Sequence, residues 1–155
     1  MDYIQYLRSM VGKSKVMMVV AGAFVFDEDN RLLLQQRSDT GQWGLPGGFM
    51  EFDETVQDTA RREVFEETGL YLGKLELFGI YSGKDHEKIF PNGDEVAKVQ
   101  IIFTCKEFSG ELVRENSESI QNDFFKLNEL PKELFTDHKQ FFNDYFSDIE
   151  RPVIK

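Results

Sequence analysis

Cysteine is nearly absent from this chain of 155 residues, in which Cys105 is the only one. A single cysteine excludes an intrachain disulfide framework and a zinc site made of thiolates, and it suits a reducing compartment, so we expect a cytoplasmic protein. Cys105 lies in a strand-like stretch of alternating residues. We therefore expect a small buried hydrophobic residue rather than a nucleophile.

Basic residues are also scarce relative to acidic ones, with 18 against 28, so the formal net charge at pH 7 is −10. Such a balance repels phosphate backbones and anionic lipids, and we expect neither nucleic acid nor a membrane as a partner. The apolar run at residues 16–26 is shorter than the ~18 residues that indicate a membrane span. With 41% hydrophobic and 14% aromatic residues, the composition is that of a folded protein, and the length fits a single domain over residues 1–155.

The spacing of apolar residues predicts three helices. It is helical at residues 1–11, at Thr55–Thr68 and at Pro131–Ile149. The second of these helices has the strongest boundaries, because Thr55 and Asp58 have capping-box spacing at its start and Gly69 is placed to end it.

Strands separate these helices along the chain. Residues 38–48 and the turn at Pro91–Asp94 are expected to be loops. Strands are expected at Val16–Phe26, Arg31–Arg37, Tyr71–Tyr81, Val96–Phe108, Glu111–Val113 and around Phe124, the first two forming a hairpin. Strands interleaved with helices in one domain predict an α/β (α+β) fold, in which a mixed sheet is covered by helices on both faces.

The second predicted helix carries carboxylates on the side that should face the core. With successive residues about 100° apart, Glu67 lies about 40° from Glu63, and Val56, Ala60 and Val64 fall on the same side. Carboxylates rarely occupy a buried face without a compensating partner. Positive charge is therefore expected among them.

A third carboxylate on this helix, Glu66, increases the demand for positive charge. Like charges at these spacings repel one another, and Arg62 can offset only one of them. Hard divalent cations such as Mg²⁺ and Mn²⁺ prefer oxygen ligands and are the natural further partner. A solvated acidic helix face is the alternative interpretation. The buried positions and the preceding Gly47-Gly48 pair, whose backbone is open to close approach, favour a metal site.

The segment Gly48–Leu70 resembles the signature of the Nudix hydrolases. Every defined position of that signature is filled here, by Gly48, Glu54, Arg62-Glu63-Val64, Glu66-Glu67 and Gly69-Leu70. At average residue frequencies, a chance match in a chain of this length is expected on the order of once in ten million. The resemblance implies the Nudix-type fold, a three-layer α/β/α sandwich with a mixed β-sheet.

The resemblance also implies an activity and a cofactor. Nudix hydrolases split a phosphoanhydride bond in a nucleoside diphosphate linked to another group, with Mg²⁺ or Mn²⁺, so the implied enzyme is a pyrophosphohydrolase acting on acid anhydrides. The metal ligands implied by position are Gly47, through its carbonyl, and Glu63, Glu66 and Glu67.

Three residues of the segment have catalytic roles by the same resemblance. Glu63 is the implied general base, Arg62 holds a glutamate by ion pairing, and Glu54 supports the loop and the helix through hydrogen bonds. Some family members instead use a carboxylate from a distant loop as the general base. The candidates for that alternative are Glu115, Glu118 and Asp123.

The motifs do not specify the substrate. Arg37, Lys84, His86 and Lys88 are candidate contacts to phosphate or base, and each is equally typical of a solvated surface. The small size favours a nucleoside triphosphate or a modified nucleotide, with ADP-ribose or a nucleotide sugar as further candidates. A non-catalytic nucleotide-sensing module on the same fold is the alternative function. Both a monomer and a homodimer are compatible with the sequence.

Several aromatic residues and the second histidine are interpreted as packing residues. His138 lies on the apolar stripe of the last predicted helix, and Phe78 and Tyr81 lie in a predicted strand. Trp43 is expected to pack beneath the glycine loop. Phe78, Tyr81 and Phe90 could each stack on a base, although aromatic residues in strands more often belong to a core.

Overall fold

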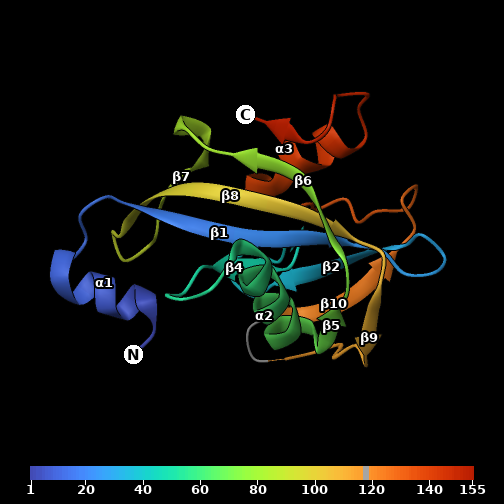
Figure 1. The fold of residues 1–155 in the computed structure, drawn as a ribbon, viewed down its shortest axis with the longest axis horizontal. Helices are drawn as coiled ribbons and strands as arrows, with labels where there is room; N and C mark the ends of the chain where they lie inside the picture. Colours follow the sequence, from blue (N-terminus) through green and yellow to red (C-terminus); the bar gives the residue numbers. More distant parts are fainter. Residues whose placement is uncertain (117–118) are drawn as a thin grey trace.

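The computed structural model describes residues 1–116 and 119–155, and its centre is a mixed six-stranded sheet (Figure 1). Its strands are β1 (Val16–Val25), β4 (Gly47–Phe49), β6 (Leu75–Tyr81), β7 (Glu87–Ile89), β8 (Glu95–Cys105) and β11 (Val153–Ile154). Five of them run in the order β11-β6-β8-β1-β4, and β7 pairs with another part of β8. The long strands β1 and β8 are parallel, as are β6 and β11, whereas β6 runs antiparallel to β8 and β4 runs antiparallel to β1.

The side chains of β1 alternate between two cores, one on each face of this sheet. One core includes Phe24, Phe26, Phe78, Phe141 and Phe142. The other includes Ala21, Ala23, Val25, Ala60 and Val64. The helix α3 (Lys139–Tyr145) covers the first face and α2 (Val56–Thr68) covers the second, on opposite sides of the sheet (Figure 1). The expected arrangement of a mixed sheet between helices is confirmed.

Two smaller sheets complete the strand structure. One has the order β10-β2-β3, formed by β2 (Leu32–Arg37), β3 (Trp43–Gly44) and β10 (Ser119–Phe125), and the other pairs β5 (Leu70–Leu72) with β9 (Phe108–Gly110). The predicted hairpin of β1 and β2 is therefore wrong. Phe26 and Leu32 form an isolated bridge next to the turn, and beyond this bridge β2 belongs to the other sheet. Both edges of β1 are occupied by β8 and β4, so β2 enters a different sheet.

The boundaries of α2 follow the predicted capping chemistry. The Thr55 hydroxyl accepts a hydrogen bond from the Asp58 backbone N–H, and the Asp58 carboxylate accepts one from the Thr55 N–H. Gly69 ends the helix at a φ of 80°, a left-handed conformation that glycine adopts without strain. These caps fix the register of the glutamates along the helix.

The C-terminal segment is far less helical than predicted. In place of one helix over Pro131–Ile149, a short 3₁₀ turn (Thr136–His138) leads into α3, which ends at Tyr145. The preceding residues are extended alongside β3, because the Trp43 N–H donates to the Glu133 carbonyl and the Phe135 N–H donates to the Trp43 carbonyl. The apolar stripe thus combines residues from an extended segment and a helix.

Other departures from the prediction occur where the chain changes sheets. The strand predicted at Tyr71–Tyr81 is broken at Gly73, so that its two parts join different sheets, and a strand occurs at β9 rather than at Glu111–Val113. The first helix, α1 (Tyr3–Val11), is present as expected and has no buried residues. Among the described residues, no helix has the length and apolar character needed to cross a membrane.

Candidate active site

Close packing of the backbone positions the glycine loop against β1. Gly22 pairs with Gly47 across β1 and β4. A Cβ on Gly47 would lie 2.6 Å from the Ala21 carbonyl oxygen, and a Cβ on Gly22 would lie 2.7 Å from that of Pro46. Neither position has room for a side chain. On Gly48, a Cβ would overlap the carboxylate of Glu63, so this carboxylate lies directly against the loop.

Arg62 is the central cation of the site. It forms a bidentate pair with Glu54, since Nε donates to Glu54 Oε2 at 2.7 Å and Nη2 donates to Oε1 at 3.0 Å. Nη2 also donates to the Phe49 carbonyl at 2.9 Å, which ties the helix to the glycine loop. The hydrogen bond from Arg62 holds the pKa of the Glu54 carboxyl below its usual range, against the opposing effect of burial. The same pair raises the pKa of Arg62.

The remaining guanidinium nitrogen of Arg62 contacts two further carboxylates. Nη1 donates to Glu63 Oε1 at 2.8 Å and to Glu66 Oε2 at 3.3 Å. The Glu63 side chain is 17% exposed and that of Glu66 is 51% exposed, so the first lies in the site and the second at its rim. Within the described part of the chain, no three carboxylate, imidazole or thiolate groups converge closely enough to hold a metal ion.

Glu67 is buried, as the helical wheel predicts, with only 7% of its surface exposed. The Gly47 N–H donates to its Oε1 at 3.1 Å, and the side-chain amide of Gln35 donates to its Oε2. One oxygen thus faces the glycine loop and the other faces β2. These donors replace part of the hydration that the carboxylate loses on burial.

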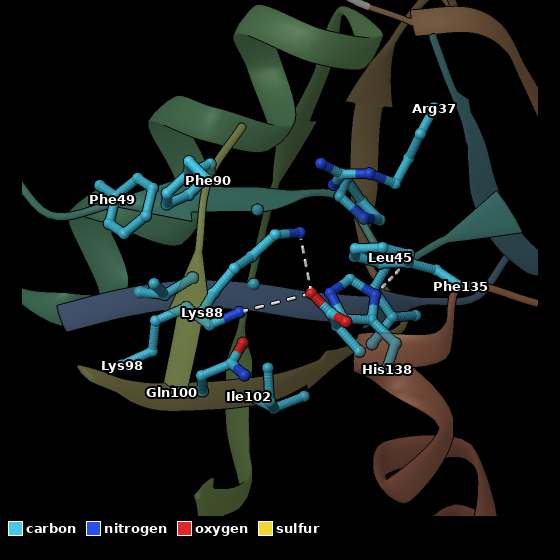
Figure 2. A pocket seen from close by; sticks show the side chains of 16 residues that line it. Arg37, Leu45, Phe49, Lys88, Phe90, Lys98, Gln100, Ile102, Phe135 and His138 are labelled. Atoms are coloured by element: carbon cyan, nitrogen blue, oxygen red, sulfur yellow. Dashed lines mark hydrogen bonds and ion pairs between the residues drawn. The ribbon is translucent and has the colours of Figure 1, made fainter. Parts of the chain in front are cut away.

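A cleft opens beside the glycine loop, with a volume of about 120 Å³ (Figure 2). Gly47 and Gly48 form part of its wall, which places it next to the glutamates of α2. Its other walls come from strands and loops that are distant in sequence. Its aromatic and cationic lining residues are Phe49, Phe90, Phe135, Arg37, Lys88 and Lys98.

The cations of the cleft are only partly neutralised. Nζ of Lys88 and Nζ of Lys98 lie 3.0 Å and 3.8 Å from the same oxygen of Asp137, as the dashed lines in Figure 2 mark. The Arg37 guanidinium stacks on the Phe135 ring at 4.1 Å and pairs with Asp39 at 3.0 Å. Burial lowers the pKa of Lys98. Burial raises the pKa of Asp137, but the hydrogen bond from Lys88 and the charges of Lys88 and Lys98 together outweigh it, and the net shift is downward.

His138 lines the same cleft as a neutral side chain. Its Nδ1 accepts a hydrogen bond from the Leu45 N–H at 3.1 Å. Burial, with the nearby Arg37 and Lys98, lowers its pKa to about 3. Because Nδ1 is the acceptor, the neutral ring carries its proton on Nε2. His138 is thus a packed histidine that also contributes to the cleft wall.

The structure brings some of the predicted substrate contacts together and separates others. Arg37 and Lys88 line the cleft, whereas Lys84 is exposed in a 3₁₀ turn (Lys84–His86) and is not among the lining residues. His86 is buried, and its Nδ1 and Nε2 contact Gln100 and Gln140 at 3.0 Å and 2.8 Å. It therefore lies behind Gln100, a residue of the cleft wall.

Sequence reasoning missed several cleft residues, among them Lys98, Phe135 and Asp137. Lys98 lies within the long strand β8, and a charged residue inside an apolar strand was a usable signal. Asp137 and Phe135 gave no comparable signal, because the segment was interpreted as one helix. Phe90 also lines the cleft.

Trp43 is a packing residue, which lies edge-on against Phe125 of β10 at 4.9 Å and borders the first core. Cys105 is buried, its thiol donates to the Glu107 carbonyl, and burial raises its pKa, which disfavours the nucleophilic thiolate.

The distant carboxylates differ in their surroundings. Glu115 is exposed, and Asp123, in β10, accepts a hydrogen bond from Arg114 at 2.7 Å. Glu118 lies outside the described residues. The geometry does not select a general base among these three.

Comparison with known proteins agrees with this fold. The model of the NUDIX domain matches residues 16–145. The ADP-ribose pyrophosphatase of Methanocaldococcus jannaschii is 37% identical over 124 residues, which cover 78% of this chain and 69% of that protein. The putative 8-oxo-dGTP diphosphatase of Bacillus subtilis is 28% identical, over 83% of this chain and 80% of that protein. The crystal structure of a MutT NUDIX hydrolase from Burkholderia pseudomallei superimposes with a TM-score of 0.69 at 29% identity, over 83% of this chain and 98% of the other.

A match over most of the chain, together with relatives above 30% identity, defines the class of this protein: the chain belongs to the Nudix family. Within that family it is an enzyme, a Nudix hydrolase acting on substrates linked to a nucleoside diphosphate.

Proposed function

We propose that this enzyme hydrolyses a phosphoanhydride bond of a nucleoside triphosphate or a modified nucleotide, in a reaction that depends on Mg²⁺ or Mn²⁺. ADP-ribose or a nucleotide sugar is the second candidate substrate, and the relatives named as an ADP-ribose pyrophosphatase and a putative 8-oxo-dGTP diphosphatase support one candidate each. The observation that carries the proposal is the glutamate cluster of α2, held by Arg62 against the glycine loop, directly beside a cationic cleft.

The donor types of the cluster, rather than their present spacing, suit a hard divalent cation. Glu63, Glu66 and Glu67 supply carboxylate oxygens, and Gly47 supplies a carbonyl, which are the ligand types that Mg²⁺ and Mn²⁺ prefer. The contact between the Glu63 carboxylate and Gly48 supports this assignment, because a side chain there would displace an oxygen donor. When bound, such a cation neutralises the polyphosphate and makes a water molecule more acidic.

The chain's own residues have separate roles in this proposal. Glu63 accepts the proton of the attacking water, with Glu115, Glu118 or Asp123 as alternative acceptors. Arg62 orients the glutamates, and Glu54 holds Arg62 in place through two hydrogen bonds. Their contribution is mainly orientation, which is the main demand of phosphoryl transfer.

Substrate binding is assigned to the cleft. A protein with a net charge of −10 would repel a polyphosphate, and three cations offset by two carboxylates, Asp137 and Asp39, provide the local attraction. Phe90 and Phe135 offer rings beside these cations, on which a base could stack.

The test is a hydrolysis screen with Mg²⁺ or Mn²⁺ on the parent protein and on Glu67→Gln. The substrates are nucleoside triphosphates, oxidised dGTP, ADP-ribose, nucleotide sugars, dinucleoside polyphosphates and CDP-alcohols. We expect turnover by the parent, dependent on the cation, and its loss in Glu67→Gln. Because this substitution relieves repulsion among carboxylates, the variant should be as stable as the parent, or slightly more so, in buffer with a chelator. Hydrolysis by Glu67→Gln at the parent rate would show that the proposed site is wrong.

The same screen tests the second candidate function, a nucleotide-sensing module without catalysis. Nucleotide binding without turnover of any substrate in the panel would favour the sensing module. The proposal treats residues 1–155 as one domain with a small-molecule partner. Sedimentation of the purified chain would distinguish a monomer from a homodimer.

A further inference from the structure

Two buried side-chain amides of neighbouring strands both contact Glu67. Gln35 in β2 donates from Nε2 to the Glu67 carboxylate. Asn122 in β10 donates from Nδ2 to the Glu67 carbonyl at 2.8 Å and to the Val113 carbonyl at 2.7 Å. Gln35 and Asn122 lie opposite each other in the β2–β10 register. One pair of strand residues therefore holds both the side chain and the main chain of the same glutamate.

Both amides leave their oxygen atoms without a hydrogen-bond partner among the described residues. Gln35 is 6% exposed and Asn122 is fully buried, so water does not readily replace the missing donors. Buried acceptors without donors destabilise a fold, and each needs an explanation. Leucine at position 35 would match its buried neighbours at 32–34, which are all leucine. Core packing therefore does not explain an amide at this position.

The orientation of the Gln35 amide provides an explanation. If the amide were rotated by half a turn, its oxygen would meet an oxygen of the Glu67 carboxylate, and two acceptors would face each other. With Nε2 facing the carboxylate, Gln35 donates a hydrogen bond to Oε2 of Glu67, while the Gly47 N–H donates one to Oε1. A carboxylate oxygen can accept more than one bond. Both donors can therefore stay in place while the same carboxylate coordinates a cation.

We propose that Gln35 is a positioning residue, which acts through Glu67 by fixing its carboxylate in the orientation that binds the divalent cation. This inference deepens the proposed function and rests on it, since Glu67 is a metal ligand only in that proposal. Groups that orient metal ligands typically change metal affinity or activity by about 10- to 100-fold when they are replaced.

The first experiment measures Mn²⁺ affinity without substrate, by electron paramagnetic resonance, for the parent and for Gln35→Met. Methionine has nearly the volume of glutamine and lacks its amide, so packing is retained. We expect Mn²⁺ binding to weaken about tenfold or more. The matched control is Gln36→Met, because successive side chains of a strand point to opposite faces and Gln36 instead donates to the Gly41 carbonyl. The control should bind Mn²⁺ like the parent.

A double-mutant cycle separates positioning from a merely structural role. If Gln35 acts through the Glu67 carboxylate, Gln35→Met should change Mn²⁺ affinity much less in the Glu67→Gln background than in the parent. In steady-state kinetics, kcat should fall about 10- to 100-fold while KM changes little. If Gln35→Met is poorly folded, Gln35→Asn, which keeps an amide but shortens the side chain, should give the same loss of Mn²⁺ affinity.

Two outcomes would overturn the inference: parent-like Mn²⁺ affinity in both Gln35 variants, or an equal effect of Gln35→Met with and without Glu67→Gln. A parent that binds Mn²⁺ but hydrolyses no substrate in the panel would contradict the proposed function alone, because the affinity measurements would still test Gln35. A parent that binds no Mn²⁺ would contradict both.

Discussion

The glutamate cluster and the cleft are adjacent but are built in different ways. The cluster comes from one continuous stretch, residues 47–67, and the register of a single capped helix arranges it. The cleft takes lining residues from β1, β2, the glycine loop, β7, β8 and the segment before α3. In the proposed function, the reaction takes place at the cluster and depends on local structure. Substrate selection takes place in the cleft and depends on tertiary structure. Variants in the cluster should therefore lower kcat, and variants in the cleft should raise KM.

The largest effect is expected for Arg62→Gln. The substitution removes the bidentate bonds to Glu54 and the contacts to Glu63 and Glu66, so that three carboxylates lose their shared counter-charge. We expect kcat to fall at least a hundredfold and the free energy of unfolding to fall by about 2 kcal/mol, below the value for a fully buried pair because Arg62 is partly exposed. Steady-state kinetics and urea unfolding measure these changes.

The control for this variant is Arg61→Gln. Arg61 precedes Arg62 on the same helix and donates to main-chain oxygens of Leu72 and Gly73 rather than to carboxylates. Its replacement should leave kcat close to the parent value. Equal losses of kcat in the two variants would contradict a special role of Arg62 in the cluster.

A smaller effect, and on KM rather than kcat, is expected for Lys98→Met in the cleft. The variant removes a half-buried cation from the wall while Lys88 still pairs with Asp137. A lost charged contact of this kind corresponds to a rise in KM of about tenfold. The increase should shrink at high salt, because the attraction is electrostatic. Lys74→Met removes an exposed lysine as the control, and a similar KM for both variants would argue against substrate binding in the cleft.

His138→Asn should change the pH dependence of stability. The native pKa of about 3 lies below the ordinary value of 6.5, so the unfolded chain binds more protons between these values. The stability contributed by the neutral ring is present above pH 6.5 and is lost as the pH falls toward 3, by about 1.4 kcal/mol per pH unit.

Urea unfolding at pH 7 and pH 5 measures this difference. The parent should lose about 2 kcal/mol more than His138→Asn between these two values. Asparagine is chosen because its side-chain oxygen can accept the Leu45 N–H in place of Nδ1. Parallel stability profiles for the two proteins would show that the ring is not held neutral by the fold.

The smallest effect is expected for Lys84→Ala. Lys84 was a candidate contact in the sequence but is exposed outside the cleft, so KM should stay unchanged and stability should change by less than about 0.5 kcal/mol. Lys88→Ala, four residues later, should raise KM because Lys88 lines the cleft. If Lys84→Ala raised KM as much as Lys88→Ala, the substrate would extend beyond the cleft.

The sequence predicted the cluster better than the cleft, for a physical reason. Helix periodicity and capping are local, so the burial of Glu67 and the end of α2 at Gly69 could be predicted. The layers could be predicted because β1 is apolar on both faces. The pairing of β2, however, depends on which strands occupy the edges of β1, and the extended form of residues 131–135 depends on bonds to Trp43. Such long-range contacts decided which side chains line the cleft.

The paired glycines at the β1–β4 contact have a consequence for how such an enzyme can diverge. The opposing backbone leaves no room for a side chain at Gly22 or at Gly47. A single substitution at either position is therefore expected to disturb the glycine loop. The cleft residues Lys98 and Asp137 come from other segments and border the cleft. A point mutation in the cleft could therefore change the substrate of a related enzyme. Gly22 and Gly47, by contrast, should stay unchanged in related enzymes that keep the same reaction.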